Sequence, residues 1–224
     1  MDVIESITRR WSCRAYLDQP VSEQQIRAIL EAARWAPSGV NAQPWQVAVV
    51  SGKTMQAISN ALIQAREDKE PENPDYDSYP AKWVEPYKSR RIDTGVSLYR
   101  ALGVSKDDPA GRKKAWYNNY RFFGAPVGLL FFIERDMGKG SWIDMGMFLQ
   151  SVMLAATGLG LATCPQASLA EYPDKVRGIL DLPDSLQLVL GMALGYPDTQ
   201  HPVNNYRLAR QAVDEFTHWY SEPA

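Results

Sequence analysis

Residues 9–14, Arg-Arg-Trp-Ser-Cys-Arg, bring together several strong hydrogen-bond donors. If the backbone is extended from Trp11 onward, Arg10, Ser12 and Arg14 project to one side, because side chains alternate along a strand. Two guanidinium groups and a hydroxyl on one face can bind a phosphate through forked, charge-assisted hydrogen bonds. The alternative is a solvated helix end, where arginine complements the helix dipole.

A second pair of arginines, Arg207 and Arg210, lies one helical turn apart near the other end of the sequence. Taken alone, this pair is typical of surface charge. The whole chain has a net charge of −2 and a pI of about 5.8, so its total charge does not favour nucleic acid. The arginine clusters therefore suit one small anion better than a polyanion.

Two further segments offer groups that suit a flat, polar ring system. The loop of residues 37–45 carries Ser38, Asn41 and Gln43, and amide side chains provide both donor and acceptor, as a uracil-like edge requires. Residues 164–168, Cys-Pro-Gln-Ala-Ser, join a predicted strand to a predicted helix start, whose unpaired backbone N–H groups can donate to a ring nitrogen. The alternatives are a helix C-cap with turn residues, and an ordinary connection.

Other familiar chemistries are excluded by the sequence. Gly158-Leu159-Gly160 begins like a dinucleotide fingerprint, but Thr163 takes the third glycine position and the segment follows a helix instead of opening one. The two histidines have no metal-ligand partners nearby in sequence, so we expect no metal. The sequence also lacks a Gly-x-Ser-x-Gly motif, so a redox cofactor is the better candidate to carry the chemistry.

Length and composition indicate a folded protein with ample material for a core. The chain has 224 residues, of which 45% are hydrophobic. The two cysteines cannot form a disulfide framework and fit a reducing compartment, so we expect a cytoplasmic protein. We find neither a signal peptide nor an apolar run long enough to cross a membrane, and we expect no membrane partner.

Hydrophobic periodicity and turn signals predict strands that alternate with helices. The predicted strands are residues 46–50, 125–133 and 186–194, and the predicted helices include residues 55–65 and 143–158. Capping boxes at Ser22–Gln25 and Ser168–Glu171 predict the starts of two more helices. This alternation implies a sheet covered on both faces.

Residues 66–123 differ from the rest of the chain. They are rich in Pro, Tyr, Trp and charge, and they carry no strand signal. Their apolar content is too small for a separate core, so we expect one domain, residues 1–224, with residues 66–123 forming a helical lid over it. The aromatic side chains of the lid offer surface for a flat ligand, or they pack the lid onto the core.

Taken in order, these motifs resemble the FMN-dependent nitroreductase family along nearly the whole chain. The matching segments are Arg10-x-Ser12-x-Arg14, Pro37-Ser38-x-x-Asn41-x-Gln43-Pro44-Trp45, Phe122 to Pro126, Gly158-Leu159-Gly160, Cys164-Pro165, Gly191-x-x-x-Gly195-Tyr196 and Arg210. Each motif is weak alone, whereas their joint order and spacing are specific.

The resemblance implies an α+β fold, a three-layer α-β-α sandwich with a central mixed sheet, assembled as an intertwined homodimer. Two FMN molecules would lie in the dimer interface. The residues expected to contact FMN are Arg10, Trp11, Ser12, Arg14, Pro37, Ser38, Gly39, Asn41, Asn118, Asn119, Pro165, Gln166, Ala167, Arg207 and Arg210.

Roles within this set also follow from the resemblance. Phosphate and ribityl contacts are expected from Arg10, Ser12 and Arg210, with Arg207 a weaker candidate, and Arg14 would lie near N1 and the C2 oxygen. The loop of residues 37–41 would reach the FMN of the partner subunit. Asn118 or Asn119 would meet the pyrimidine edge, and the backbone of Gln166 and Ala167 would face N5.

The implied activity is reduction of a nitroaromatic or quinone by NADH or NADPH. A cation such as Arg14 near N1 would stabilise the charge of reduced flavin and favour two-electron transfer. The nucleotide and the electrophile would use one slot in turn, which gives ping-pong kinetics and requires no catalytic side chain. The alternatives are other chemistry on the same fold, namely enone reduction, reductive dehalogenation or flavin fragmentation, and a non-catalytic flavin-binding protein.

Overall fold

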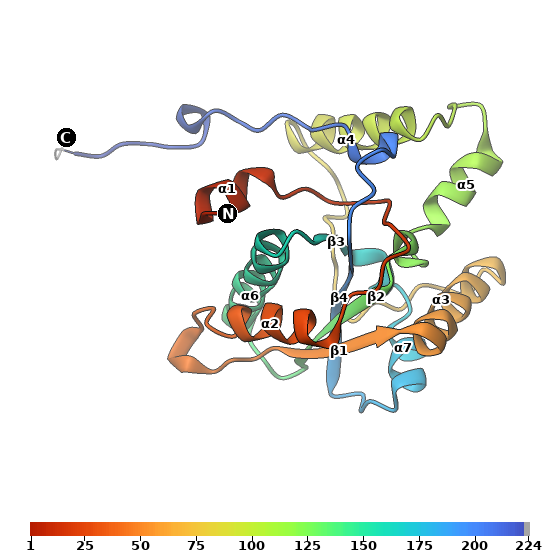
Figure 1. Cartoon of the computed structure of the whole chain (residues 1–224), viewed down its shortest axis with the longest axis horizontal. Helices are drawn as coiled ribbons and strands as arrows, with labels where there is room; N and C mark the ends of the chain where they lie inside the picture. Colours follow the sequence, from red (N-terminus) through yellow and green to blue (C-terminus); the bar gives the residue numbers. More distant parts are fainter. Residues whose placement is uncertain (222–224) are drawn as a thin grey trace.

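A four-stranded sheet forms the middle layer of the protein (Figure 1). The computed structural model describes residues 1–221 of the chain. The strands are β1 (Gln46–Ser51), β2 (Val127–Glu134), β3 (Ala162–Gln166) and β4 (Leu186–Gly195), and they lie in the order β1-β2-β4-β3. The three strands predicted with bounds are therefore confirmed, and β3 is the strand predicted to lead into residues 164–168; it pairs with β4.

Neighbouring strands pair antiparallel throughout, whereas we expected a mixed sheet. Among the described residues, the parallel component is one isolated bridge between Ser12 and Thr163. The backbone N–H of Arg14 donates to Asn204 Oδ1 at 2.9 Å instead of extending the ladder along β3. The N-terminal segment is thus held against the sheet edge without becoming a fifth strand.

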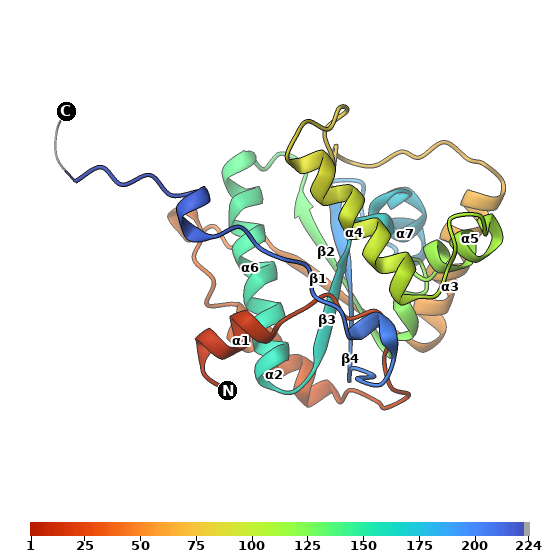
Figure 2. The same ribbon diagram turned by 90° about the horizontal axis from the view of Figure 1, so that it is seen from above.

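Helices cover both faces of the sheet, which confirms the expected sandwich (Figure 2). The helices are α1 (Val3–Arg9), α2 (Glu23–Ala33), α3 (Gly52–Glu67), α4 (Tyr87–Ala101), α5 (Pro109–Tyr117), α6 (Lys139–Gly158) and α7 (Pro173–Leu180). Short 3-10 turns are η1 (Gly39–Asn41), η2 (Phe122–Gly124), η3 (Ala167–Ala170), η4 (Pro202–Asn204) and η5 (Val213–Glu215). Residues of α2 and α6 pack on one face, and residues of α3 and α7 pack on the other.

Alternation along β2 explains how one strand serves two cores. Leu129 and Phe131 face the α2–α6 side, whereas Leu130 and Phe132 face the α3–α7 side, and all four are buried. Successive residues of a strand point to opposite faces of the sheet, so neighbouring side chains of β2 enter different cores. Burial of such a side chain stabilises the fold by about 1.5–3 kcal/mol.

The two predicted capping boxes have different outcomes. The one at α2 is confirmed: Ser22 Oγ accepts from the Gln25 backbone N–H at 3.2 Å, and Gln25 Oε1 accepts from the Ser22 backbone N–H at 3.1 Å. The one at Ser168 is wrong, because the chain forms η3 there and α7 begins later, after Tyr172. The Glu171 carboxylate, assigned to that cap, instead accepts from Tyr120 Oη at 2.5 Å.

Two segments lie outside the packed layers. Helix α4 has no buried residue, and in Figure 1 it lies above the sheet, as α1 does, whereas α5 ends at the buried Tyr117. After η4 the chain runs away from the body as an extended arm, with Trp219 and Tyr220 80% and 90% exposed. Within residues 1–221 the structure has no helix that is both long and apolar enough to cross a membrane.

Candidate functional site

The N-terminal segment after α1 adopts the extended form that the sequence predicted. Cys13 is fully buried, whereas Arg10, Ser12 and Arg14 are partly exposed, as expected for side chains that alternate between the interior and an open face. The Cys13 backbone N–H donates to the Thr163 carbonyl oxygen at 3.0 Å. This contact with β3 fixes which side of the segment carries the two arginines.

The four arginines singled out in the sequence gather around this segment. Burial, followed by the nearby positive charge of Arg210, lowers the pKa of Arg10. The Arg207 guanidinium lies over the Trp11 ring, 4.6 Å from its centroid. Among the described residues, Arg10, Arg14, Arg207 and Arg210 form no ion pair with a carboxylate, whereas the adjacent Arg9 pairs with Glu5 at 3.0 Å. Like charges held together without an acidic partner are stabilised when an anion binds between them.

A cavity of about 400 Å³ opens beside this cluster. Its wall includes Arg14, Asn119 and Pro165 to Ser168, so it unites three of the predicted motifs. The volume falls in the range of small-ligand and cofactor sites. Asn118 and Asn119 both line a smaller cavity of about 40 Å³ next to it, whereas only Asn119 also lines the 400 Å³ cavity.

Several buried polar atoms around the cavity have no hydrogen-bond partner. Five such atoms occur among the described residues. Gln166 Oε1 and Ser168 Oγ belong to residues that line the cavity, and Trp11 Nε1 and Thr163 Oγ1 belong to the arginine segment and to the strand that it contacts. An unpaired buried polar group costs about 1–3 kcal/mol. A ligand that carries phosphate, hydroxyl and ring donor and acceptor groups fits both these atoms and the arginines, and FMN has all of these.

Gln166 connects β3 to the lid segment. Its Nε2 donates to the Asn119 carbonyl oxygen at 2.6 Å, and the residue is 3% exposed. Gln166 also pairs with Gly191 of β4. A Cβ atom at Gly191 would overlap Leu169 Cδ1 of η3, so glycine is required for η3 to pack this closely on the sheet. Gly191 thereby helps to place the backbone of residues 166–168 at the cavity.

The loop of residues 37–41 lies outside the wall of the 400 Å³ cavity. None of these residues lines the 400 Å³ cavity, and the Gly39 backbone N–H donates to the Asp144 carboxylate of α6 at 3.2 Å. Val40, Asn41 and Gln43 have φ angles of 49°, 58° and 48°, and Val40 is fully exposed. Left-handed conformations at residues other than glycine cost about 1–3 kcal/mol and often mark functional loops.

Sequence reasoning missed part of the cavity wall. Glu72, Tyr76 and Asp77 line it from the segment before α4, and Glu171 lines it from the end of η3; burial raises the pKa of Glu171. No local motif marks these residues, because long-range contacts place them: Tyr76 Oη, for example, donates to the Val189 carbonyl oxygen at 2.6 Å.

Some aromatic residues of the 66–123 segment pack into the core, and others offer surface to a ligand. Tyr117, Tyr120 and Phe122 are buried in the core, whereas Trp116 lines the cavity. The Arg66 guanidinium lies 4.6 Å from the centroid of the Trp116 ring and fixes one of its faces.

Comparison with known proteins agrees with the fold and the motifs. The model of the nitroreductase family matches residues 7–196. The 4-nitrobenzoate reductase of Pseudomonas putida is 39% identical over 213 residues, which cover 95% of this chain and 93% of that protein. The nitrobenzene nitroreductase of Ectopseudomonas oleovorans is 38% identical over 217 residues, which cover 96% of each chain. The protein belongs to the nitroreductase family.

Solved structures extend this agreement to three dimensions. The FMN- and NADPH-dependent nitroreductase NfnB from Sphigopyxis sp. strain HMH superimposes with a TM-score of 0.95 at 43% identity, over 99% of this chain and 100% of that one. The FMN-dependent NfnB of Mycobacterium smegmatis, solved with NADPH, gives a TM-score of 0.91 at 33% identity, over 98% and 100% of the two chains. The family and fold expected from the motifs are thus confirmed.

Proposed function

We propose that the protein is an FMN-dependent oxidoreductase that reduces nitroaromatic compounds with NADH or NADPH by a ping-pong mechanism. The observation that carries this proposal is the 400 Å³ cavity of a nitroreductase fold, which is lined by the unpaired Arg14 and by Gln166 and Ser168 with their unpartnered buried oxygens. Relatives of similar length reduce 4-nitrobenzoate or nitrobenzene, as their names state. A quinone is the second substrate class.

The arginine cluster provides the anchor for the phosphate of FMN. Arg210 is close enough to Arg10 for its positive charge to lower the pKa of Arg10, and Ser12 adds a hydroxyl donor on the same side. Arg207 covers the Trp11 ring and contributes to the same positive region. Charge-assisted hydrogen bonds of this kind contribute roughly 1.5–3 kcal/mol each.

Arg14, Asn119 and residues 165–167 hold the ring system in this proposal. Arg14 places a positive charge in the cavity, and that charge favours the reduced, anionic form of a bound flavin. The backbone of Gln166 and Ala167 orients the flavin edge. FMN, when bound, supplies hydride acceptance and donation, so the protein needs no catalytic acid or nucleophile of its own.

A homodimer completes the site in this proposal. Val3 and Ile4 on α1 are 63% and 66% exposed, and Val40 and the C-terminal arm are also exposed apolar surface. Such surface favours association of two copies. The strained loop of residues 37–41, including Pro37, Ser38, Gly39 and Asn41, then contacts the FMN of the partner subunit.

We also propose a single-domain organisation and a cytoplasmic location for the protein. The chain forms one domain, residues 1–224, with residues 66–123 as a lid. Its two cysteines are buried and free, which suits a reducing cytoplasm.

Anaerobic mixing tests the proposed activity. Purified FMN-loaded protein is mixed with NADH or NADPH while the absorbance of oxidised flavin is recorded. We expect bleaching, followed by recovery when a nitroaromatic is added. Flavin that stays oxidised with both nucleotides contradicts the proposed activity and favours a non-catalytic flavin-binding role. Recovery with an enone or a halogenated phenol, but not with a nitroaromatic or quinone, favours other chemistry on the same fold.

A further inference from the structure

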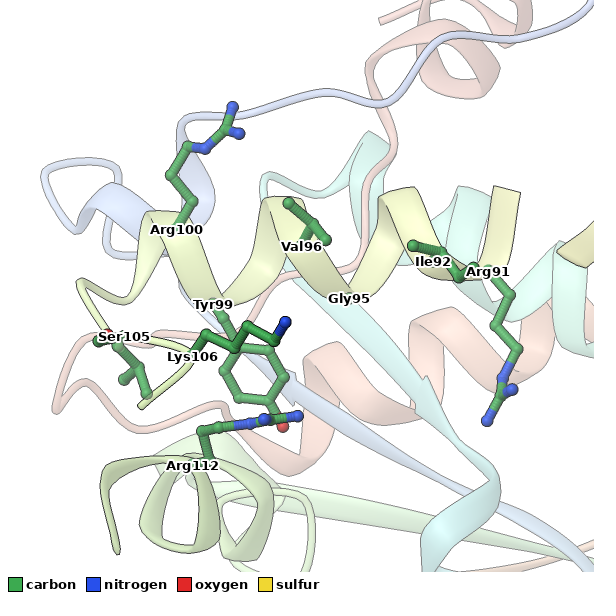
Figure 3. Close-up of a pocket in the computed structure, with 10 residues that line it drawn as sticks. Arg91, Ile92, Gly95, Val96, Tyr99, Arg100, Ser105, Lys106 and Arg112 are labelled. Carbon is green, nitrogen blue, oxygen red and sulfur yellow. The ribbon is translucent and has the colours of Figure 1, made fainter. Parts of the chain in front are cut away.

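A second hollow, of about 610 Å³, lies between α4 and the start of α5 (Figure 3). Four of its lining residues are cationic, namely Arg91, Arg100, Lys106 and Arg112, and none is acidic. The rest of the wall is mostly apolar: Ile92, Gly95, Val96 and Tyr99 of α4, followed by Val104 and Ser105. A positive hollow with an apolar wall suits a ligand that is both anionic and partly apolar.

Lys106 and Arg112 are the cations best placed to act together. Figure 3 shows both side chains near the Tyr99 ring, and the Arg112 guanidinium lies 5.1 Å from the ring centroid. Neither cation makes an ion pair or a side-chain hydrogen bond within residues 1–221, whereas the adjacent Lys113 pairs with Glu67 at 2.7 Å. In the same view, Arg100 points away from this group.

The hollow is linked to the FMN cavity without being part of it. The two share no lining residue. Between them lies the 40 Å³ cavity, which Tyr99 shares with the hollow and which Arg14 and Trp116 share with the FMN cavity. A ligand whose reacting end lies beside Gln166 therefore reaches the hollow only if it is long.

We propose that this hollow binds the adenosine end of NADPH, with Lys106 and Arg112 at its 2′-phosphate. This inference rests on the proposed function, because it assumes a nicotinamide nucleotide as reductant. A dinucleotide has the length to extend from the FMN cavity through the small cavity to the hollow, and Tyr99 offers a ring face for adenine. The 2′-phosphate, which NADH lacks, supplies the charge that the unpaired cations match, so these residues make the enzyme prefer NADPH.

Fragment binding tests the site without any redox reaction. The FMN-loaded protein is titrated by calorimetry with adenosine 2′,5′-bisphosphate and with adenosine 5′-monophosphate. We expect the bisphosphate to bind about tenfold or more tightly, and the double variant Lys106→Gln/Arg112→Gln to lose this difference. The matched control Lys53→Gln/Arg27→Gln removes one lysine and one arginine from exposed positions and keeps the difference. Equal binding of both fragments to the natural protein overturns the proposal.

Stopped-flow flavin reduction provides the second measurement. The double variant should require about tenfold more NADPH for half-maximal reduction, with little change for NADH. An unchanged NADPH requirement overturns the assignment of the hollow and leaves the proposed oxidoreductase function intact. If the natural protein is reduced by neither nucleotide, the proposed function fails, and fragment binding still decides whether the hollow recognises a 2′-phosphate. A raised KM for 4-nitrobenzoate, with NADPH unaffected, assigns the cations to the substrate carboxylate and overturns the proposal.

Discussion

The side chain of Gln166, at the end of β3, donates to the backbone carbonyl of Asn119, which follows α5, at 2.6 Å. These residues are 47 positions apart in the sequence, and their contact joins the central sheet to the segment of residues 66–123. The other amide atom, Gln166 Oε1, is buried without a partner beside the cavity. The Gln166 side chain therefore contacts residues 66–123 through its Nε2 atom, while its Oε1 atom remains available to accept a hydrogen bond from a ligand.

Replacing Gln166 should affect both stability and cofactor binding. In Gln166→Leu the Asn119 carbonyl loses its donor, so the apo protein should lose about 1–3 kcal/mol of unfolding free energy, measured in urea. FMN affinity, measured by fluorescence titration, should also fall. The control Gln64→Leu removes an exposed glutamine that bonds to Asp68, and it should change stability by less than about 0.5 kcal/mol. Normal FMN affinity in Gln166→Leu would exclude this residue from the flavin site.

Arg10 should strengthen FMN binding and contribute nothing to the stability of the apo protein. Its neighbour Arg210 is also positive, and both burial and that neighbour disfavour the charge at Arg10. Arg10→Gln should therefore leave the apo protein as stable as before or slightly more stable, while FMN affinity falls by about tenfold or more through loss of a charge-assisted bond. The adjacent Arg9→Gln is the control, because Arg9 is exposed and pairs with Glu5 at 3.0 Å. A destabilised apo protein with unchanged FMN affinity would assign Arg10 a structural role.

Arg14 should set the reduction potential of the bound flavin. Its guanidinium lines the cavity and is steadied by the Ser12 carbonyl oxygen, to which it donates at 3.2 Å. Removing this charge in Arg14→Met should lower the two-electron midpoint potential by about 30 mV or more, which corresponds to about 1.4 kcal/mol. Spectroelectrochemistry of the FMN-loaded variant measures the change. A potential equal to that of the natural protein would place Arg14 away from the flavin ring.

Sequence patterns predicted those features that depend on near neighbours. The Ser22 capping box and the alternation along β2 involve residues only a few positions apart, and both are present. The cap predicted at Ser168 is absent, because Tyr120 binds the Glu171 carboxylate from 51 positions away and the local pattern cannot show that competitor.

The candidate site likewise contains residues that local motifs predicted and residues that only long-range contacts place there. The arginine segment and residues 165–168 were predictable as motifs, and the structure brings them together. The acidic wall from Glu72 and Asp77 was not predictable, since it depends on how residues 66–123 pack against the rest of the chain. The separation of Asn119 from Asn118 likewise required the structure, because both belong to one turn after α5.

Stability should fall in alkaline solution because of the buried thiol of Cys13. Burial raises the pKa of Cys13 from 9.0 to about 11. Between these values the unfolded chain loses a proton that the folded chain keeps, so the unfolding free energy decreases as pH rises, by up to about 1.4 kcal/mol per pH unit. Urea unfolding of the natural protein and of Cys13→Ala between pH 8 and 11 measures this slope. The variant should show a shallower decrease, and identical slopes would contradict the assignment.

Dimerisation should depend on the exposed face of α1. Ile4 is 66% exposed although it is a large apolar residue, and it lies on the same face as Ile7. An acidic side chain there would have to be desolvated in an interface, so Ile4→Glu should shift sedimentation toward the monomer and reduce retention of FMN. The same change at Ile179, on α7 across the sheet from α1 (Figure 1), is the control and should leave the dimer intact. A natural protein that sediments as a monomer and still retains FMN would contradict the interface model, because loop 37–41 could then make no contact with a partner's flavin.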